Sequence, residues 1–200
     1  MPTTNDQRLA APAIRIGYGF DSHEFQAGIP LKIGGIALAH DMGLGGHSDG
    51  DVLLHALTDA LLGAVAAPDI GALFPPSDAK WKGADSVVFL REALKRVRDA
   101  GYAVANMDAS LILAAPKIGP HALAIRTRVA DLLGVQCDCV GLKAKTPEGL
   151  NLENAALAHV VVLLEKHSGA RPLTGNQSQT AKSAKKRRKG RKEKSADRSR

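Results

Sequence analysis

The chain has 200 residues, 44% of them hydrophobic and only 4% aromatic, so one folded domain with an aliphatic core is expected. No apolar run approaches the roughly 18–20 residues that cross a bilayer, and residues 1–13 lack the apolar stretch of a signal peptide. These observations exclude a membrane-spanning protein and favour a cytoplasmic one.

The net charge of +7 is unevenly distributed along the chain. Residues 182–200 carry eleven Lys or Arg against two acidic residues, which leaves a charge of −2 for the rest. We therefore expect a flexible leader over 1–13, a folded domain over 14–167 and a basic disordered tail over 168–200. The charge of this tail is able to attract nucleic acid, but the tail has no aromatic residue to stack on bases. A solvated extension without a partner is the favoured interpretation.

Strand and helix patterns alternate along the folded part of the chain. The first half predicts a strand over 14–20, a short strand region over 31–38 broken at Gly34-Gly35, a glycine-rich loop over 41–46, and a helix that Ser48 or Asp49 caps and that runs to about Ala66. The second half predicts a helix over 86–100, a strand over 102–113, a turn at Pro116, a helix over 118–133, and strands over 140–145 and 158–164. Apolar periodicity and Gly or Pro boundaries carry these predictions. They favour an α+β fold in which helices pack on one face of a mixed sheet.

Two cysteines, Cys137 and Cys139, stand two residues apart. That separation is too short for an easy disulfide, and the chain has no second cysteine pair for a thiolate zinc site. We interpret both as free thiols in a reducing compartment.

Acidic and histidine side chains cluster at two places. Asp21 and His23 follow the first expected strand, where residues i and i+2 point the same way. Asp51, His55 and Asp59 are spaced i, i+4 and i+8, and therefore share one face of the expected helix. Asp21, His23 and His55 together form a His₂-carboxylate set, which is a common zinc arrangement with a fourth position open for substrate.

Each of these features also has a purely structural interpretation. The Asp-x-His pattern alone is a weak signal of a metal site. His55 is also compatible with a structural histidine on an amphipathic helix. Asp51 and Asp59 are also compatible with a solvated helix face. The metal interpretation is favoured by the surrounding sequence, in which a strand end, a glycine-rich loop and a helix start with His47 beside it follow one another.

Further sequence blocks occur in a fixed order around these residues. They are 16–23 (IGYGFDSH), 47–55 (HSDGDVLLH), 58–63 (TDALLG), 69–71 (DIG), 74–75 (FP), 82–86 (KGADS), 115–117 (APK) and 143–150 (KAKTPEGL). Over residues 14–166 the chain resembles the 2-C-methyl-D-erythritol 2,4-cyclodiphosphate synthase family of isoprene biosynthesis. Each block alone is explained by a turn, a helix start or an exposed strand face, but their joint order favours the family.

The resemblance implies a metal-dependent phosphorus-oxygen lyase that cyclises a cytidine-diphosphate-linked methylerythritol phosphate and releases CMP. It implies a homotrimer with active sites between subunits, a zinc ion on Asp21, His23 and His55, and a second ion, Mg²⁺ or Mn²⁺, near Glu148. The implied substrate contacts are Asp21, His23, His47, Ser48, Asp69, Ile70, Gly71, Phe74, Asp78, Ala115, Pro116, Lys117, Lys145, Thr146 and Glu148, of which His47 and Thr146 stabilise the transition state. Asp69 and Gly71 correspond to the ribose pair, Phe74 and Asp78 to the methylerythritol stretch, and residues 115–117 to the cytosine turn.

The sequence departs from the family pattern in two places. A Gly-Arg-Gly-Glu-Gly-like stretch is replaced by residues 151–156, so a phosphate-contacting arginine has no counterpart, and Pro76 stands where an acidic sugar contact is common. We expect activity with altered affinity. Two other functions stay open: a nucleic-acid-associated protein acting through its tail, and a zinc hydrolase of nucleotide diphosphates with Asp51 or Glu148 as base.

Overall fold

The computed structural model describes residues 11–167. The sheet strands are β1 (Ile14–Ala27), β4 (Met42–Leu44), β5 (Tyr102–Leu113), β6 (Val140–Lys145) and β7 (Ala155–Lys166), and β2 (Leu31–Ile33) pairs with β3 (Ile36–Leu38). The helices are α1 (Val52–Ala64), α2 (Ile70–Leu73), α3 (Ser86–Asp99) and α4 (Ala122–Leu133), with 3₁₀ turns at Ala79–Trp81, Gly119–His121 and Cys137–Cys139. The predicted basic tail and most of the predicted leader lie outside the described residues. Within the described part, no helix has the length and apolar character needed to cross a membrane.

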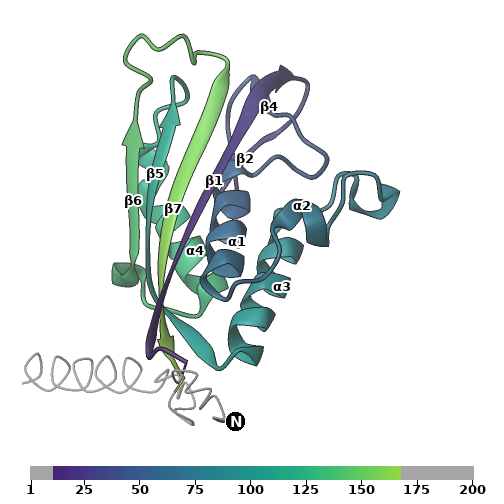
Figure 1. Cartoon of the computed structure of the whole chain (residues 1–200). Coiled ribbons are helices and arrows are strands. Elements are labelled where there is room, and N and C mark those ends of the chain that lie inside the picture. The colour runs from purple at the N-terminus through teal and green to yellow at the C-terminus, as the bar shows by residue number, and fades with distance from the viewer. Residues whose placement is uncertain (1–10, 168–200) are drawn as a thin grey trace, which may run out of the picture. The chain divides into compact units, whose positions relative to one another are not determined.

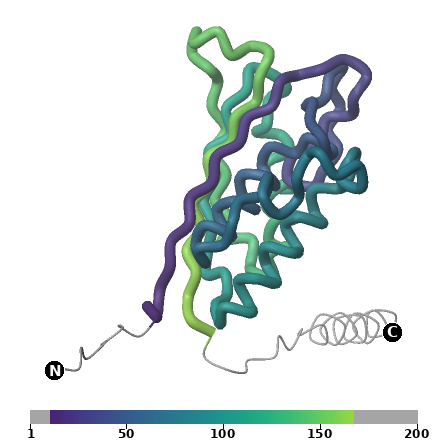
Figure 2. Tube along the Cα trace, turned by 45° about the vertical axis from the view of Figure 1, so that its right-hand side comes forward, coloured from purple at the N-terminus to yellow at the C-terminus, as the bar shows by residue number. Residues whose placement is uncertain are grey.

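The five-stranded sheet has the order β4-β1-β7-β5-β6. Only β5 and β6 are parallel, while every other neighbouring pair is antiparallel. Figure 1 and Figure 2 show the helices gathered on one face of this sheet. The structure therefore confirms the predicted α+β fold with helices on one face.

Two glycines bring β1 unusually close to α1. A Cβ atom at Gly17 would lie 1.8 Å from the carbonyl oxygen of Ala60, and one at Gly19 would lie 1.9 Å from that of Ala56. Only glycine fits such a backbone-to-backbone approach. Because side chains alternate along a strand, Asp21 and His23 continue the row that faces the helix.

The opposite face of β1 carries large apolar side chains that no helix within residues 11–167 covers. Ile14, Ile16, Tyr18 and Phe20 have exposed fractions of 59%, 69%, 58% and 44%. A contiguous apolar row of this kind on a sheet face is typical of a surface that meets another protein chain.

Several predicted boundaries were wrong because pairing partners lie far away in the sequence. β1 does not end at Phe20, since β7 continues to pair with it as far as Glu24, opposite Ala155. β7 is correspondingly longer at both ends than the predicted strand over 158–164. The predicted loop over 41–46 contains β4, which pairs with the last residues of β1.

The predicted helix starts also needed correction. The cap of α1 is Asp51, not Ser48 or Asp49: its Oδ1 accepts hydrogen bonds from the N–H groups of Leu54 at 3.0 Å and Gly34 at 2.9 Å. The helix predicted from residue 118 starts at Ala122, because residues 119–121 form a 3₁₀ turn that contains Pro120.

The other predicted boundaries agree closely with the structure. The strands 102–113 and 140–145 are confirmed, α3 begins at residue 86 as predicted, and Gly134 ends α4 in the left-handed conformation with φ 73°.

Candidate metal centre and substrate pocket

Three ligand-type side chains from two elements converge at one point. Asp21 and His23 project from β1, and His55 lies on the first turns of α1. The Oδ2 atom of Asp21 lies 2.8 Å from Nε2 of His23 and 3.0 Å from Nδ1 of His55, and the two ring nitrogens lie 3.0 Å apart. The convergence predicted from the sequence is confirmed.

The charges of this cluster reinforce one another in the metal-free protein. Burial would raise the pKa of Asp21, but hydrogen bonds from His23 and His55 outweigh it and lower that pKa to about 2. Burial lowers the pKa of His23, whereas its hydrogen bond to Asp21 raises it, and the net change is upward. The cluster thus contains a permanent carboxylate beside a histidine that holds its proton unusually well.

The donor set and its spacing fit a divalent cation of the zinc type. A tetrahedral zinc site with bonds of about 2.0–2.1 Å has ligand-to-ligand distances of about 3.3 Å. The three observed distances of 2.8–3.0 Å are close to that value. Two imidazoles and one carboxylate also leave one coordination position for a substrate oxygen. Asp21, His23 and His55 therefore form a possible metal-binding triad.

The other acidic residues of the helix face have structural roles. Asp51 is fully buried, and its Oδ2 accepts from the N–H group of Gly35 at 2.6 Å in addition to its helix-cap bonds. Asp59 accepts from the N–H group of Ile70 at 2.8 Å and so anchors the start of α2. Neither carboxylate belongs to the triad, so the predicted shared face holds only one ligand, His55.

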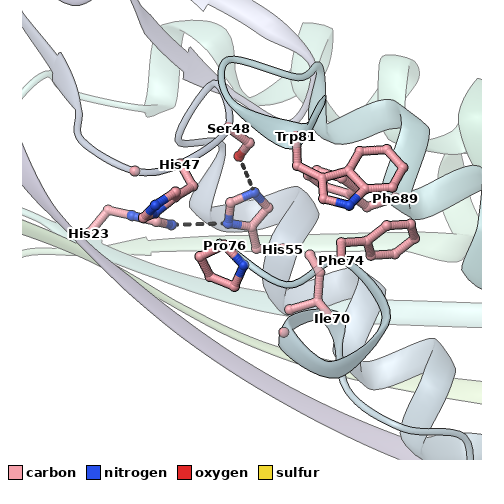
Figure 3. Close-up of a pocket in the computed structure, with 11 residues that line it drawn as sticks. His23, His47, Ser48, His55, Ile70, Phe74, Pro76, Trp81 and Phe89 are labelled. Atoms are coloured by element: carbon pink, nitrogen blue, oxygen red, sulfur yellow. Dashed lines mark hydrogen bonds between the residues drawn. The ribbon is translucent and has the colours of Figure 1, made fainter. Parts of the chain in front are cut away.

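A cavity of about 240 Å³ opens beside the triad. Figure 3 shows His23 and His55 facing each other in its wall, with Ser48 bonded to His55. Its lining includes the predicted residues His23, His47, Ser48, His55, Ile70, Gly71 and Phe74, together with Gly46, Pro76, Trp81 and Phe89. The structure thus brings most of the first half of the predicted site together.

Besides Asp21 of the triad, two predicted contacts of this half stand outside the cavity lining. Asp69 caps α2, where its Oδ1 accepts from the N–H group of Ala72 at 2.8 Å. Asp78 pairs with Lys80 at 3.1 Å before the 3₁₀ turn at 79–81.

The far wall of the cavity is aromatic, and only Phe74 of its three rings was predicted from the sequence. Phe74 lies with its ring centroid 5.0 Å from that of Trp81 and 4.6 Å from that of Phe89 (Figure 3). The chain has only seven Phe, Trp and Tyr residues, so three of them within sixteen positions was an available signal. This wall supplies an apolar surface opposite the charged triad.

The second half of the predicted site forms a separate cavity of about 380 Å³. Its lining includes Pro116, Lys117, Lys145 and Thr146 and no residue of the first cavity. Ala115 and Glu148 are not in this lining, but the hydroxyl of Thr146 donates to the Glu148 carboxylate. In the sheet order, β6 is three strands away from β1, which is about 14 Å at about 4.8 Å per strand.

The model of the YgbB family matches residues 14–165. A 2-C-methyl-D-erythritol 2,4-cyclodiphosphate synthase from Koribacter versatilis (strain Ellin345) is 70% identical over 153 residues, which are 76% of this chain and 99% of the relative.

Solved structures agree with the sequence matches. A 2C-methyl-D-erythritol-2,4-cyclodiphosphate synthase structure has a TM-score of 0.72 at 46% identity, and a CDP-bound form has 0.72 at 44%. Each match covers 76% of this chain and 100% of the solved chain.

Proposed function

The chain belongs to the YgbB family of 2-C-methyl-D-erythritol 2,4-cyclodiphosphate synthases, and from this membership we propose how its residues carry out the reaction. The enzyme converts 4-diphosphocytidyl-2-C-methyl-D-erythritol 2-phosphate to 2-C-methyl-D-erythritol 2,4-cyclodiphosphate and CMP, a step in making terpenoid precursors. The single observation that carries the proposal is the convergence of Asp21, His23 and His55 within 3.0 Å of one another beside a cavity that His23 and His55 line.

The reaction is an internal displacement at phosphorus. An oxygen of the 2-phosphate attacks the β-phosphorus, and the bond from that phosphorus to the oxygen shared with the α-phosphorus breaks. CMP leaves with that oxygen, and no water is consumed, which makes the enzyme a phosphorus-oxygen lyase. The attacking phosphate is already ionised near neutral pH, so the protein has to position two anionic groups and neutralise their charge.

The cations assigned to this site have the role of charge neutralisation. When bound, a zinc ion at Asp21, His23 and His55 and an Mg²⁺ or Mn²⁺ ion near Glu148 would withdraw negative charge from the phosphate and diphosphate oxygens.

The side chains around the triad hold the substrate in a folded shape. His47 and Ser48 line the cavity beside the triad and are placed to donate to phosphate oxygens, as is Thr146 from the second cavity. Ile70, Gly71 and Phe74 present the opposite wall, where the methylerythritol carbons are shielded from water. We assign Asp69 to the ribose and Asp78 to the polyol end, beside the cavity rather than in its lining.

The cytidine end requires the second cavity. We assign Ala115, Pro116, Lys117 and Lys145 to this end, with Glu148 beside the diphosphate. The CDP-bound relative supports a nucleotide-linked ligand.

A homotrimer explains how one substrate reaches both cavities. The two cavities of one chain share no lining residue, and an exposed apolar row runs along β1 from Ile14 to Phe20. Burial of this row against neighbouring copies would bring the second cavity of one subunit toward the triad of another. Active sites between subunits follow from that arrangement.

The alternative functions are less well supported. Asp51 is unsuitable as the base of a hydrolase, because it is fully buried and its carboxylate accepts three backbone N–H groups. The nucleic-acid hypothesis rests on the basic tail, which lies outside the described residues. A cytoplasmic location stays a prediction, to which the two free cysteines are suited.

The proposal is tested by incubating the full chain and substrate in H₂¹⁸O with added Zn²⁺ and Mg²⁺. Phosphorus NMR and mass spectrometry of the products should show a cyclic diphosphate and CMP without ¹⁸O, and a chelator should abolish both products. Linear phosphates that carry one solvent oxygen would identify a hydrolase instead.

A further inference from the structure

The imidazole of His55 has a second nitrogen that faces away from the triad. Its Nε2 atom lies 2.9 Å from the hydroxyl oxygen of Ser86 and 2.9 Å from that of Ser48. Ser86 is fully buried at the first position of α3. A histidine ligand binds a cation through one nitrogen, and the group bonded to its other nitrogen decides which of the two carries the proton.

The proton of the Ser86 hydroxyl has a fixed destination. Ser86 donates its hydroxyl proton to Oδ1 of Asp49, whose Oδ2 accepts from the Lys32 ammonium at 3.0 Å. Burial would raise the pKa of Asp49, but the hydrogen bonds from Ser86 and Lys32 outweigh it and lower that pKa below its usual value. Asp49 is thus an ionised carboxylate, which only accepts hydrogen bonds.

The direction of every bond in this chain follows from that charge. Because Ser86 gives its proton to Asp49, only its oxygen lone pair remains for Nε2 of His55. Nε2 therefore carries a hydrogen that it donates to Ser86, and the Ser48 hydroxyl beside it is left to donate elsewhere. Nδ1 faces Asp21 and His23 and is the nitrogen that a cation would meet.

We propose that Ser86 and Asp49, supported by Lys32, are positioning residues that hold a hydrogen on Nε2 of His55 and so direct its Nδ1 to the cation. This relay of four residues joins three elements: Lys32 lies on β2, Asp49 precedes α1, which carries His55, and Ser86 begins α3. It orients the ligand without touching the substrate. The inference rests on the metal site of the proposed function, but it requires nothing of the reaction itself.

The two relay residues differ in how severely their loss disturbs His55. In S86A, the hydroxyl of Ser48 is still within reach of Nε2, so the Nε2–H tautomer keeps one acceptor. In D49N, the charged Lys32 ammonium attracts the new amide oxygen more strongly than the backbone N–H of Ser86, which donates to Oδ1 at 3.2 Å, so the NH₂ group turns toward Ser86. The Ser86 hydroxyl is then released to donate to Nε2, and the tautomer that places hydrogen on Nδ1 becomes favoured.

The test compares S86A and D49N with the wild type and with T58V. Thr58 is a matched control because it is also buried and carries a hydroxyl. It lies on α1, and its hydroxyl donates a hydrogen bond to the backbone oxygen of Leu54 instead of contacting His55. In metal-free full-length protein, ¹⁵N-histidine NMR should show a hydrogen on Nε2 of His55 in the wild type and T58V. This hydrogen should be partly lost in S86A and largely lost in D49N.

Zinc affinity provides the second readout, measured by competition with a chromophoric chelator. We expect a loss of about 10–100-fold in S86A and a larger loss in D49N, the range found when partners of metal-bound histidines are removed, with T58V unchanged. Wild-type tautomer and affinity in both relay variants would overturn the inference. Failure of the wild type to bind zinc would instead count against the proposed function, because the tautomer measurement needs no metal.

Discussion

Replacement of Gly19 by alanine should separate the two halves of the triad. The new Cβ would lie 1.9 Å from the carbonyl oxygen of Ala56, whereas an ordinary contact needs about 3.2 Å, so β1 and α1 must move apart by about 1.3 Å. Both sides of the clash are backbone, and no side chain is able to turn away. His55 adjoins Ala56, so its distances to Asp21 and His23 would grow from 3.0 Å to about 4 Å, beyond the roughly 3.3 Å of a tetrahedral zinc site.

The consequences are measurable in stability and in metal binding. Overpacking of this kind costs about 1–3 kcal/mol, and the backbone clash places G19A at the upper end, a fall in Tm of about 6–12 °C for a domain of this size. Calorimetry of metal-free protein checks the first effect and zinc titration the second. The matched control is G63A on the same helix, where the nearest atom to the new Cβ is 3.8 Å away and alanine should stabilise by about 0.5–1 kcal/mol. If G19A kept the wild-type Tm and zinc affinity, the close approach of β1 and α1 would not be what assembles the triad.

Three further predictions follow from the same geometry. Zinc affinity should fall as the pH drops through the pKa of His23. Burial lowers that pKa, but the hydrogen bond to Asp21 raises it above 6.5 on balance, and the bound proton must leave before the metal enters. A zinc affinity that stays constant between pH 8 and pH 5 would contradict this. I16K places a charge in the apolar row of β1, where Ile16 is 69% exposed, and should convert the proposed trimer to monomers in sedimentation velocity. K95A on the exposed side of α3 should leave the assembly intact. F89A removes a buried ring from the aromatic wall and should lower the free energy of unfolding by about 3–5 kcal/mol. It should also raise KM by a larger factor than it lowers kcat. Equal factors in KM and kcat would argue against a substrate-shielding role for the wall.

Much of this site was predictable because its residues carry local signals. Asp21 and His23 share one side of an extended chain whatever the strand pairs with. His55 falls within the helix predicted from a cap at Ser48 or Asp49 to about Ala66. The fold class followed in the same way, from the alternation of strand and helix patterns.

The parts that sequence reasoning missed depend on long-range pairing. Asp51 was interpreted as a member of a shared acidic face, yet it caps α1 and holds the Gly34-Gly35 turn, two contacts that require the β2–β3 hairpin to be in place. Ser86 belongs to a recognised block, but its contact with His55 spans 31 residues. Glycine is required at positions 17 and 19 only because α1 packs closely against β1, and the local sequence does not encode that contact.

The most direct measurement is an X-ray absorption spectrum of the zinc-loaded chain at the zinc edge. We predict one ion per chain, bound by two imidazole nitrogens and light oxygen ligands at about 2.0–2.1 Å, with the imidazole signal halved in H55A. A spectrum that shows only oxygen ligands, or sulfur from Cys137 or Cys139, would contradict the assignment of Asp21, His23 and His55 to a single cation.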